Sequence, residues 1–169
     1  MIRAADSRAL TAVVVGMKLV AREVRNDINR ATTATLGPKW KALVQVNAAR
    51  RMDGLMLATG VRAKGGNPPM LLAAQSRRAV GRTKRLVPQQ DWAAWEFGGD
   101  RGHVATYTRR NRSGSGTHKV TRHTNRHLRP RKRSGYTVYP ALADFLPDAV
   151  SLWVQLFMKK VYDAAEGKG

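Results

Sequence analysis

No cysteine occurs in this chain of 169 residues. The sequence therefore excludes a disulfide framework, a zinc site built on thiolates and a cysteine nucleophile. A core of this size can be buried by one arrangement of helices and sheet without covalent or metal cross-links. We expect a single domain over residues 1–169.

Acidic residues are scarce. Asp and Glu number 11 against 31 Lys and Arg, which gives a formal net charge of +20 at pH 7. A charge of this size repels itself unless salt, nucleic acid or an acidic protein surface screens it. The composition therefore predicts a polyanionic partner.

Long apolar runs are also missing near the start of the chain. The longest one, residues 10–20, is interrupted by Thr11, Gly16 and Lys18 and is followed by charged residues. This run is too short and too charged to span a bilayer. The first residues do not follow the order of positive, apolar and small residues that a signal peptide needs. We expect a protein that is not exported and does not contact a membrane.

Apolar residues at three- and four-residue steps predict a helix over about residues 6–34 and another that begins at Pro38 and ends near Arg51. Leu36-Gly37-Pro38 is expected to separate them, because glycine ends helices and proline suits a first helical turn. A last helix is expected to open at Pro140, with Pro147 bending or dividing it.

Short apolar runs between turn residues predict strands at residues 55–61, 70–75 and 92–97, with a further candidate at residues 136–139. We expect Trp92, Trp95 and Phe97 to anchor one face of this sheet. The predicted fold is α+β, with N-terminal helices, a small antiparallel sheet carrying a long basic hairpin or arm, and a C-terminal helix.

Residues 99–135 form a basic block in which eleven Lys and Arg minus one Asp give +10, half of the net charge. Val104, Tyr107 and Val120 lie on either side of Ser113-Gly114-Ser115-Gly116, which predicts an exposed hairpin with a flexible tip. A disordered arm is the alternative. The predicted contacts to a partner or polyanion are Arg109, Arg110, Arg112, Lys119, Arg122, Arg126, Arg129, Arg131, Lys132 and Arg133.

All four histidines lie in this block, and His123 and His127 have a spacing that suits two ligands on one helical face. Their neighbours do not favour a helix, and no Asp, Glu or Cys stands near them to complete a metal site. The glycine-rich stretches lack the Lys-Ser/Thr ending of a phosphate-binding loop. We expect no metal and no cofactor.

Glu96, with Asp91 and Asp100 nearby in sequence, could be considered as part of a pair of catalytic acids. Nothing in the sequence places these carboxylates in a pocket or adds a histidine or serine to them. We therefore predict no catalytic residue and a protein that is not an enzyme.

Two short segments resemble the tail-completion, or neck, family of long-tailed double-stranded DNA phages. Ala93 to Gly98 resembles the family's aromatic-Ala-x-x-x-Glu-Phe-Gly segment, with two residues in place of three between Ala93 and Glu96, and Pro140-Ala141-Leu142 resembles the segment that opens its C-terminal helix. The order of the segments, with a variable loop between them, is similar. The residues that carry this signature are Trp92, Trp95, Glu96, Phe97, Gly98 and Pro140.

The resemblance implies a structural virion protein, assembled in the host cytoplasm, that forms part of a ring joining the capsid portal to the tail. Its implied partners are copies of itself, other neck and tail proteins, and packaged DNA or acidic protein surfaces. Only Thr59-Gly60-Val61-Arg62 represents the family's Thr-Gly-x-Leu-Arg. Completion, terminator and adaptor roles therefore stay open. The alternative is a general nucleic-acid-binding protein that holds phosphates with residues 101–133.

Overall fold

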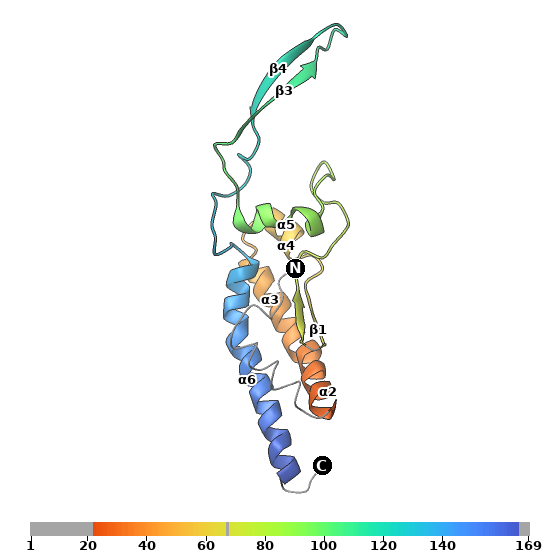
Figure 1. Cartoon of the computed structure of the whole chain (residues 1–169), viewed down its shortest axis with the longest axis vertical. Helices are drawn as coiled ribbons and strands as arrows, with labels where there is room; N and C mark the ends of the chain where they lie inside the picture. The colour runs from red at the N-terminus through yellow and green to blue at the C-terminus, as the bar shows by residue number, and fades with distance from the viewer. Residues whose placement is uncertain (1–21, 67, 166–169) are drawn as a thin grey trace.

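The computed structural model describes residues 22–66 and 68–165, and within them the chain has the predicted α+β fold (Figure 1). The first part of the predicted N-terminal helix, including the apolar run at residues 10–20, lies outside the described residues. The elements in chain order are α2 (Arg22–Ala31), η2 (Thr32–Leu36), α3 (Gly37–Asn47), α4 (Arg51–Leu57), β1 (Arg62–Lys64), β2 (Met70–Leu72), α5 (Pro88–Phe97), β3 (Val104–Arg110), β4 (Thr117–His123) and α6 (Val138–Ala165).

The chain does not break at Leu36-Gly37-Pro38, so that prediction was wrong. Gly37 has helical dihedrals, φ −57° and ψ −53°, and η2 is a π-helical turn that joins α2 to α3 without interruption. In a regular α-helix the Pro38 ring would clash with the carbonyl group four residues earlier. The wider π-turn accommodates the proline while the helix continues. The predicted second helix exists, but it ends at Asn47.

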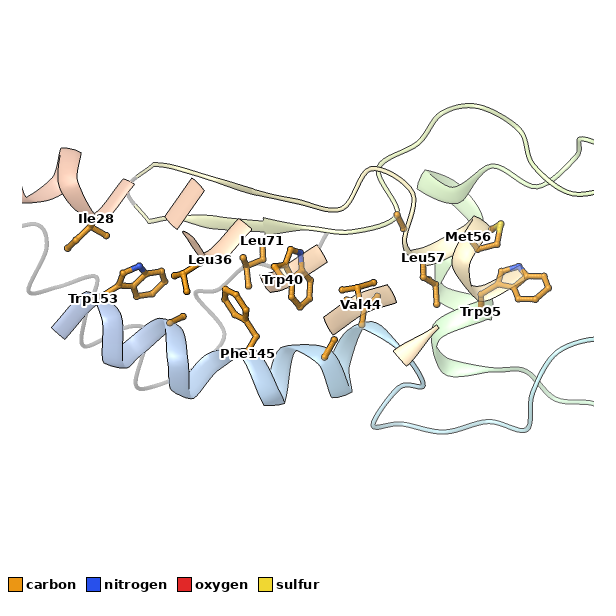
Figure 2. Packing of buried hydrophobic residues seen from close by; sticks show 14 of the residues in the cluster. Ile28, Leu36, Trp40, Val44, Met56, Leu57, Leu71, Trp95, Phe145 and Trp153 are labelled. Atoms are coloured by element: carbon orange, nitrogen blue, oxygen red, sulfur yellow. The ribbon is translucent and has the colours of Figure 1, made fainter. Parts of the chain in front are cut away.

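Helix α6 runs antiparallel to α2 and α3, and these helices share the main core (Figure 1). Pro147 lies inside α6 and does not divide it, and residues 138–139 open this helix, so the predicted strand there was wrong. The rings of Trp40 and Phe145 pack edge to face, with their centroids 5.5 Å apart. Trp153 donates a hydrogen bond of 2.9 Å from Nε1 to the buried Thr32 hydroxyl. Figure 2 shows these aromatic rings lying between the two helical layers.

Two further predicted strands, at residues 55–61 and 92–97, are wrong because residues 55–57 and 92–97 are helical. Residues 51–57 form α4, and residues 88–97 form α5, which has Pro88 at its first turn. The Asp91 carboxylate, in the first turns of α5, accepts a 2.7 Å hydrogen bond from the N–H of Val87, the N-cap residue of this helix. An apolar run this short fits a strand or one face of a short helix equally well. Trp92, Trp95 and Phe97 therefore anchor a helix, not a sheet face.

Both sheets are antiparallel and two-stranded, as predicted in type. In the first, β1 pairs with β2 from Arg62↔Leu72 to Lys64↔Met70. This sheet is fixed to the helices by polar contacts, since Trp40 Nε1 donates to the Leu72 carbonyl at 3.1 Å and the Gly66 N–H donates to Asn29 Oδ1 at 2.8 Å. The second sheet, β3 with β4, is the predicted basic hairpin.

By length and composition alone, the part of α6 from Val138 to Asp163 is apolar enough to cross a bilayer. The first half of the helix lies in the core, where Ala141, Phe145 and Ala149 are fully buried. The second half exposes an apolar stripe, formed by Val154, Met158, Val161 and Tyr162. The expected lack of membrane contact stays a prediction.

Candidate functional site

The basic hairpin forms an arm that projects from the helices, at the end of the molecule opposite the C-terminal end of α6 (Figure 1). Strands β3 and β4 pair in register from Val104↔His123 to Arg110↔Thr117, and the Thr124 N–H donates to the His103 carbonyl at 3.3 Å. We call residues 103–124 the arm. None of them is buried. The hairpin prediction is confirmed.

The tip of the arm is closed by the Asn111 side chain. Its Nδ2 donates to the Ser115 carbonyl at 2.8 Å, and its Oδ1 lies 2.6 Å from His118 Nδ1. Gly114 and Gly116 supply the positive φ angles, +85° and +75°, that this turn requires. His118, in β4, therefore helps to hold the turn through Asn111. Among residues 22–66 and 68–165, no three His, Asp or Glu side chains gather as a metal site would need.

Both faces of the arm are cationic. It contains five Lys and Arg and no Asp or Glu. Side chains alternate between the two faces of a strand, and residues paired across the hairpin lie on the same face. The register therefore shows on which face each Lys or Arg of the two strands lies. Arg109 and Arg122 lie on the face of Tyr107, Arg110 and Lys119 lie on the other, and Arg112 lies at the tip. All five are exposed.

The two ends of the arm are tied together on α5 by the base segment, which we define as residues 125–135. The Gly99 N–H donates to the Arg129 carbonyl at 2.9 Å, and the Lys132 N–H donates to the Phe97 carbonyl at 2.8 Å. Leu128 is buried beside Gly99. Hydrogen bonds on both sides of the arm therefore fix where it leaves the body.

Arg129 differs from the other predicted contacts because it is used inside the protein. Its guanidinium forms an ion pair with Asp53, whose side chain is 2% exposed, and lies 4.6 Å from the centre of the Tyr136 ring. Asp53 also accepts a 3.1 Å hydrogen bond from the Arg50 N–H at the start of α4. The pair thus joins the base segment to α4. The other nine predicted contact residues are exposed.

Replacing Arg129 with Gln should cost about 3 kcal/mol of unfolding free energy, because it leaves the buried Asp53 carboxylate without its cation. The matched control is Arg131→Gln, an exposed base two residues away, which should change stability by less than about 0.5 kcal/mol. Denaturant unfolding measures both. Equal midpoints for the two variants would show that the ion pair contributes nothing to stability.

Glu96 joins the two signature segments. Its side chain is fully buried, and Oε1 accepts hydrogen bonds from the backbone N–H groups of Thr137, Val138 and Tyr139 at 3.3, 3.0 and 3.0 Å. Oε2 accepts a further bond from the Val138 N–H at 2.9 Å. These N–H groups stand at the start of α6, where a helix has no internal acceptors for them. Glu96 is therefore the N-terminal cap of the C-terminal helix.

The aromatic residues of the first signature lie around this cap. Phe97 lies between Trp92 and Tyr139, with ring centres 5.9 and 5.2 Å away. Trp95 is 9% exposed and lies close to Met56 and Leu57 at one end of the core (Figure 2). Pro140 follows in the first turn of α6, where its missing N–H needs no partner.

The three acids considered for catalysis are each engaged by the backbone. Glu96 caps helix α6, Asp91 accepts the hydrogen bond from the Val87 N–H at the start of α5, and Asp100 Oδ1 accepts a 2.9 Å hydrogen bond from the Gly102 N–H in an exposed turn. The arrangement gives these carboxylates a structural use. The pairing of Asp53 with Arg129 was missed, because the two residues lie 76 positions apart and no local pattern connects them.

No protein-family model, no curated protein and no solved structure matches this chain. The arm, the base segment and the Glu96 cap are therefore the features from which we infer a function.

Proposed function

We propose that the chain is a structural subunit of the phage neck and forms part of a ring that joins the capsid portal to the tail. The observation that carries this proposal is the contact between the two signature segments. The glutamate of the first segment caps the helix that the second one opens. The segments on which the resemblance depends thus form one structural unit, and the arm is the variable loop inserted between them.

The outline of the molecule supports an assembly role. A ring subunit needs two different surfaces that meet between neighbours, because head-to-tail contacts close a ring. The cationic arm lies at one end of the molecule, and the exposed stripe of α6 lies towards the other (Figure 1). Val154, Met158 and Val161 recur at helical steps on one face, which suits packing against a second copy of the chain.

A general nucleic-acid-binding protein is the alternative function, favoured by the charge of the arm alone. The two proposals differ in whether the protein is a component of the mature virion. A neck subunit is a component of the mature virion, with neck and tail proteins as its partners. A general nucleic-acid-binding protein need not be part of the particle.

Deleting the gene from the phage genome that carries it should yield filled heads and finished tails that do not join. The physical reason is that the ring between them would be missing. Electron microscopy of the lysate measures the fraction of joined particles. Supplying the wild-type chain from a plasmid is the control and should restore joining. Normal numbers of joined, infectious particles without the chain would contradict the proposal.

A further inference from the structure

We propose that the arm binds double-stranded DNA by placing its two cationic faces against the phosphates on either side of a groove. Double-stranded DNA would be the partner of the arm in the neck subunit, and this proposal rests on the neck function proposed above. Its physical basis is the distribution of charge on the ribbon.

The composition of the arm favours a nucleic acid over a protein surface. The core of a protein–protein interface is poor in charge and depends on apolar and aromatic anchors. The arm has five bases, no acid, and only Val104 and Tyr107 as exposed large apolar residues. Interfaces with DNA are more polar and much more positive than protein interfaces. The acid-free stretch extends beyond the arm, over residues 101–143.

The register of the hairpin favours a partner with phosphates on two sides. A flat acidic surface would meet one face of the ribbon and leave the bases of the other face unused. A two-stranded ribbon fits into the major groove of DNA, which has a phosphate backbone along each wall. In that position Arg109 and Arg122 face one wall, while Arg110 and Lys119 face the other.

Threonines between the bases suit the same partner. Residues 106, 108, 117 and 121 are exposed threonines on the face of Arg110 and Lys119. Hydroxyl groups donate hydrogen bonds to phosphate oxygens, and such contacts position a protein on DNA without reading its sequence. We therefore expect binding that depends little on base sequence and strongly on salt.

The experiment measures binding of the purified full chain to a mixed-sequence duplex of about 30 base pairs, roughly three helical turns. Fluorescence anisotropy gives the affinity at several salt concentrations between about 50 and 200 mM. The arm variant replaces Arg109, Arg110, Arg112, Lys119 and Arg122 with Gln. Since no arm residue is buried, its melting temperature should equal that of the wild type.

A body variant is the matched control because it loses the same number of charges. It replaces exposed bases far from the arm in sequence, Lys41, Arg51, Arg78, Lys84 and Arg85, with Gln. Both variants have a formal charge of +15, from 20 minus 5. A plot of log affinity against log salt has a negative slope, and the arm variant should make that slope less steep by roughly 3–5 units, at about 0.9 for each lost phosphate contact. The body variant should change it by less than about one unit.

Two half-variants test the use of both faces. Arg109→Gln with Arg122→Gln, and Arg110→Gln with Lys119→Gln, should each make the slope less steep by roughly two units. A loss confined to one pair would overturn the two-sided arrangement. The proposal would be overturned if the arm variant bound DNA with the same affinity and salt dependence as the body variant. If that arm variant also failed to join heads to tails, the partner of the arm would be an acidic protein. Loss of DNA binding with normal joining after gene deletion would uphold this inference and refute the neck function.

Discussion

Glu96→Ala is expected to lower the melting temperature by roughly 8–16 °C, which corresponds to about 4 kcal/mol for a chain of this size. The side chain is fully buried and accepts hydrogen bonds from three successive N–H groups at the start of α6. Each buried donor that loses its acceptor costs about 1–3 kcal/mol, and the favourable contact of the carboxylate with the helix dipole is lost as well. A thermal melt followed by circular dichroism measures the change.

Glu96→Gln is the control that separates charge from shape. Its amide keeps one oxygen for the three N–H groups, but it loses the negative charge and turns an NH₂ group towards the helix start. We expect about half of the loss seen with Ala. A melting temperature within about 2 °C of the wild type for Glu96→Ala, less than 1 kcal/mol, would show that Glu96 is not the cap of α6.

Gly98→Ala is expected to cost at least about 4 kcal/mol, or to prevent folding. Gly98 has φ +71° and ψ −169°, a region that only glycine occupies readily. A Cβ atom there would lie 2.2 Å from the Pro130 carbonyl oxygen and 2.5 Å from that of Arg129. Both neighbours are backbone atoms of the base segment, so they cannot rotate away. The substitution should therefore separate α5 from the base segment.

Gly81→Ala is the matched control. Gly81 also has a positive φ, +87°, but a Cβ there would meet only the ends of the Met52 and Leu86 side chains at 3.7 and 3.9 Å. We expect a loss of about 1–2 kcal/mol, the cost of the backbone conformation alone. Equal losses for the two variants would mean that the close approach of the base segment to Gly98 contributes nothing.

Sequence patterns were sufficient where a segment is long or strictly alternating. The period of α6 and the basic hairpin follow from apolar spacing and turn residues alone, whereas the strand predicted at residues 70–75 is limited to residues 70–72. Predictions from the sequence were wrong where tertiary contacts determine the local structure. Continuation through Pro38 requires a π-turn whose Thr32 hydroxyl is held by Trp153, far away in the chain. The run at residues 92–97 was too short to distinguish a helix from a strand.

For the candidate site, composition was sufficient to find the exposed cations but not to sort them. Arg129 looks like its basic neighbours in the sequence, and only the fold brings it to the buried Asp53. Glu96 was singled out by resemblance, whereas its use as a helix cap depends on the approach of residues 137–139. Partners brought together from distant positions leave no local pattern.

A cryo-electron microscopy reconstruction of the head–tail junction would test whether this chain is a subunit of the neck. The particles would be those assembled from the genome that encodes the chain. We predict a ring of identical subunits between portal and tail, into which α2, α3 and α6 fit side by side with the arm extending from one end. A fully traced junction in which every subunit belongs to another protein would contradict it.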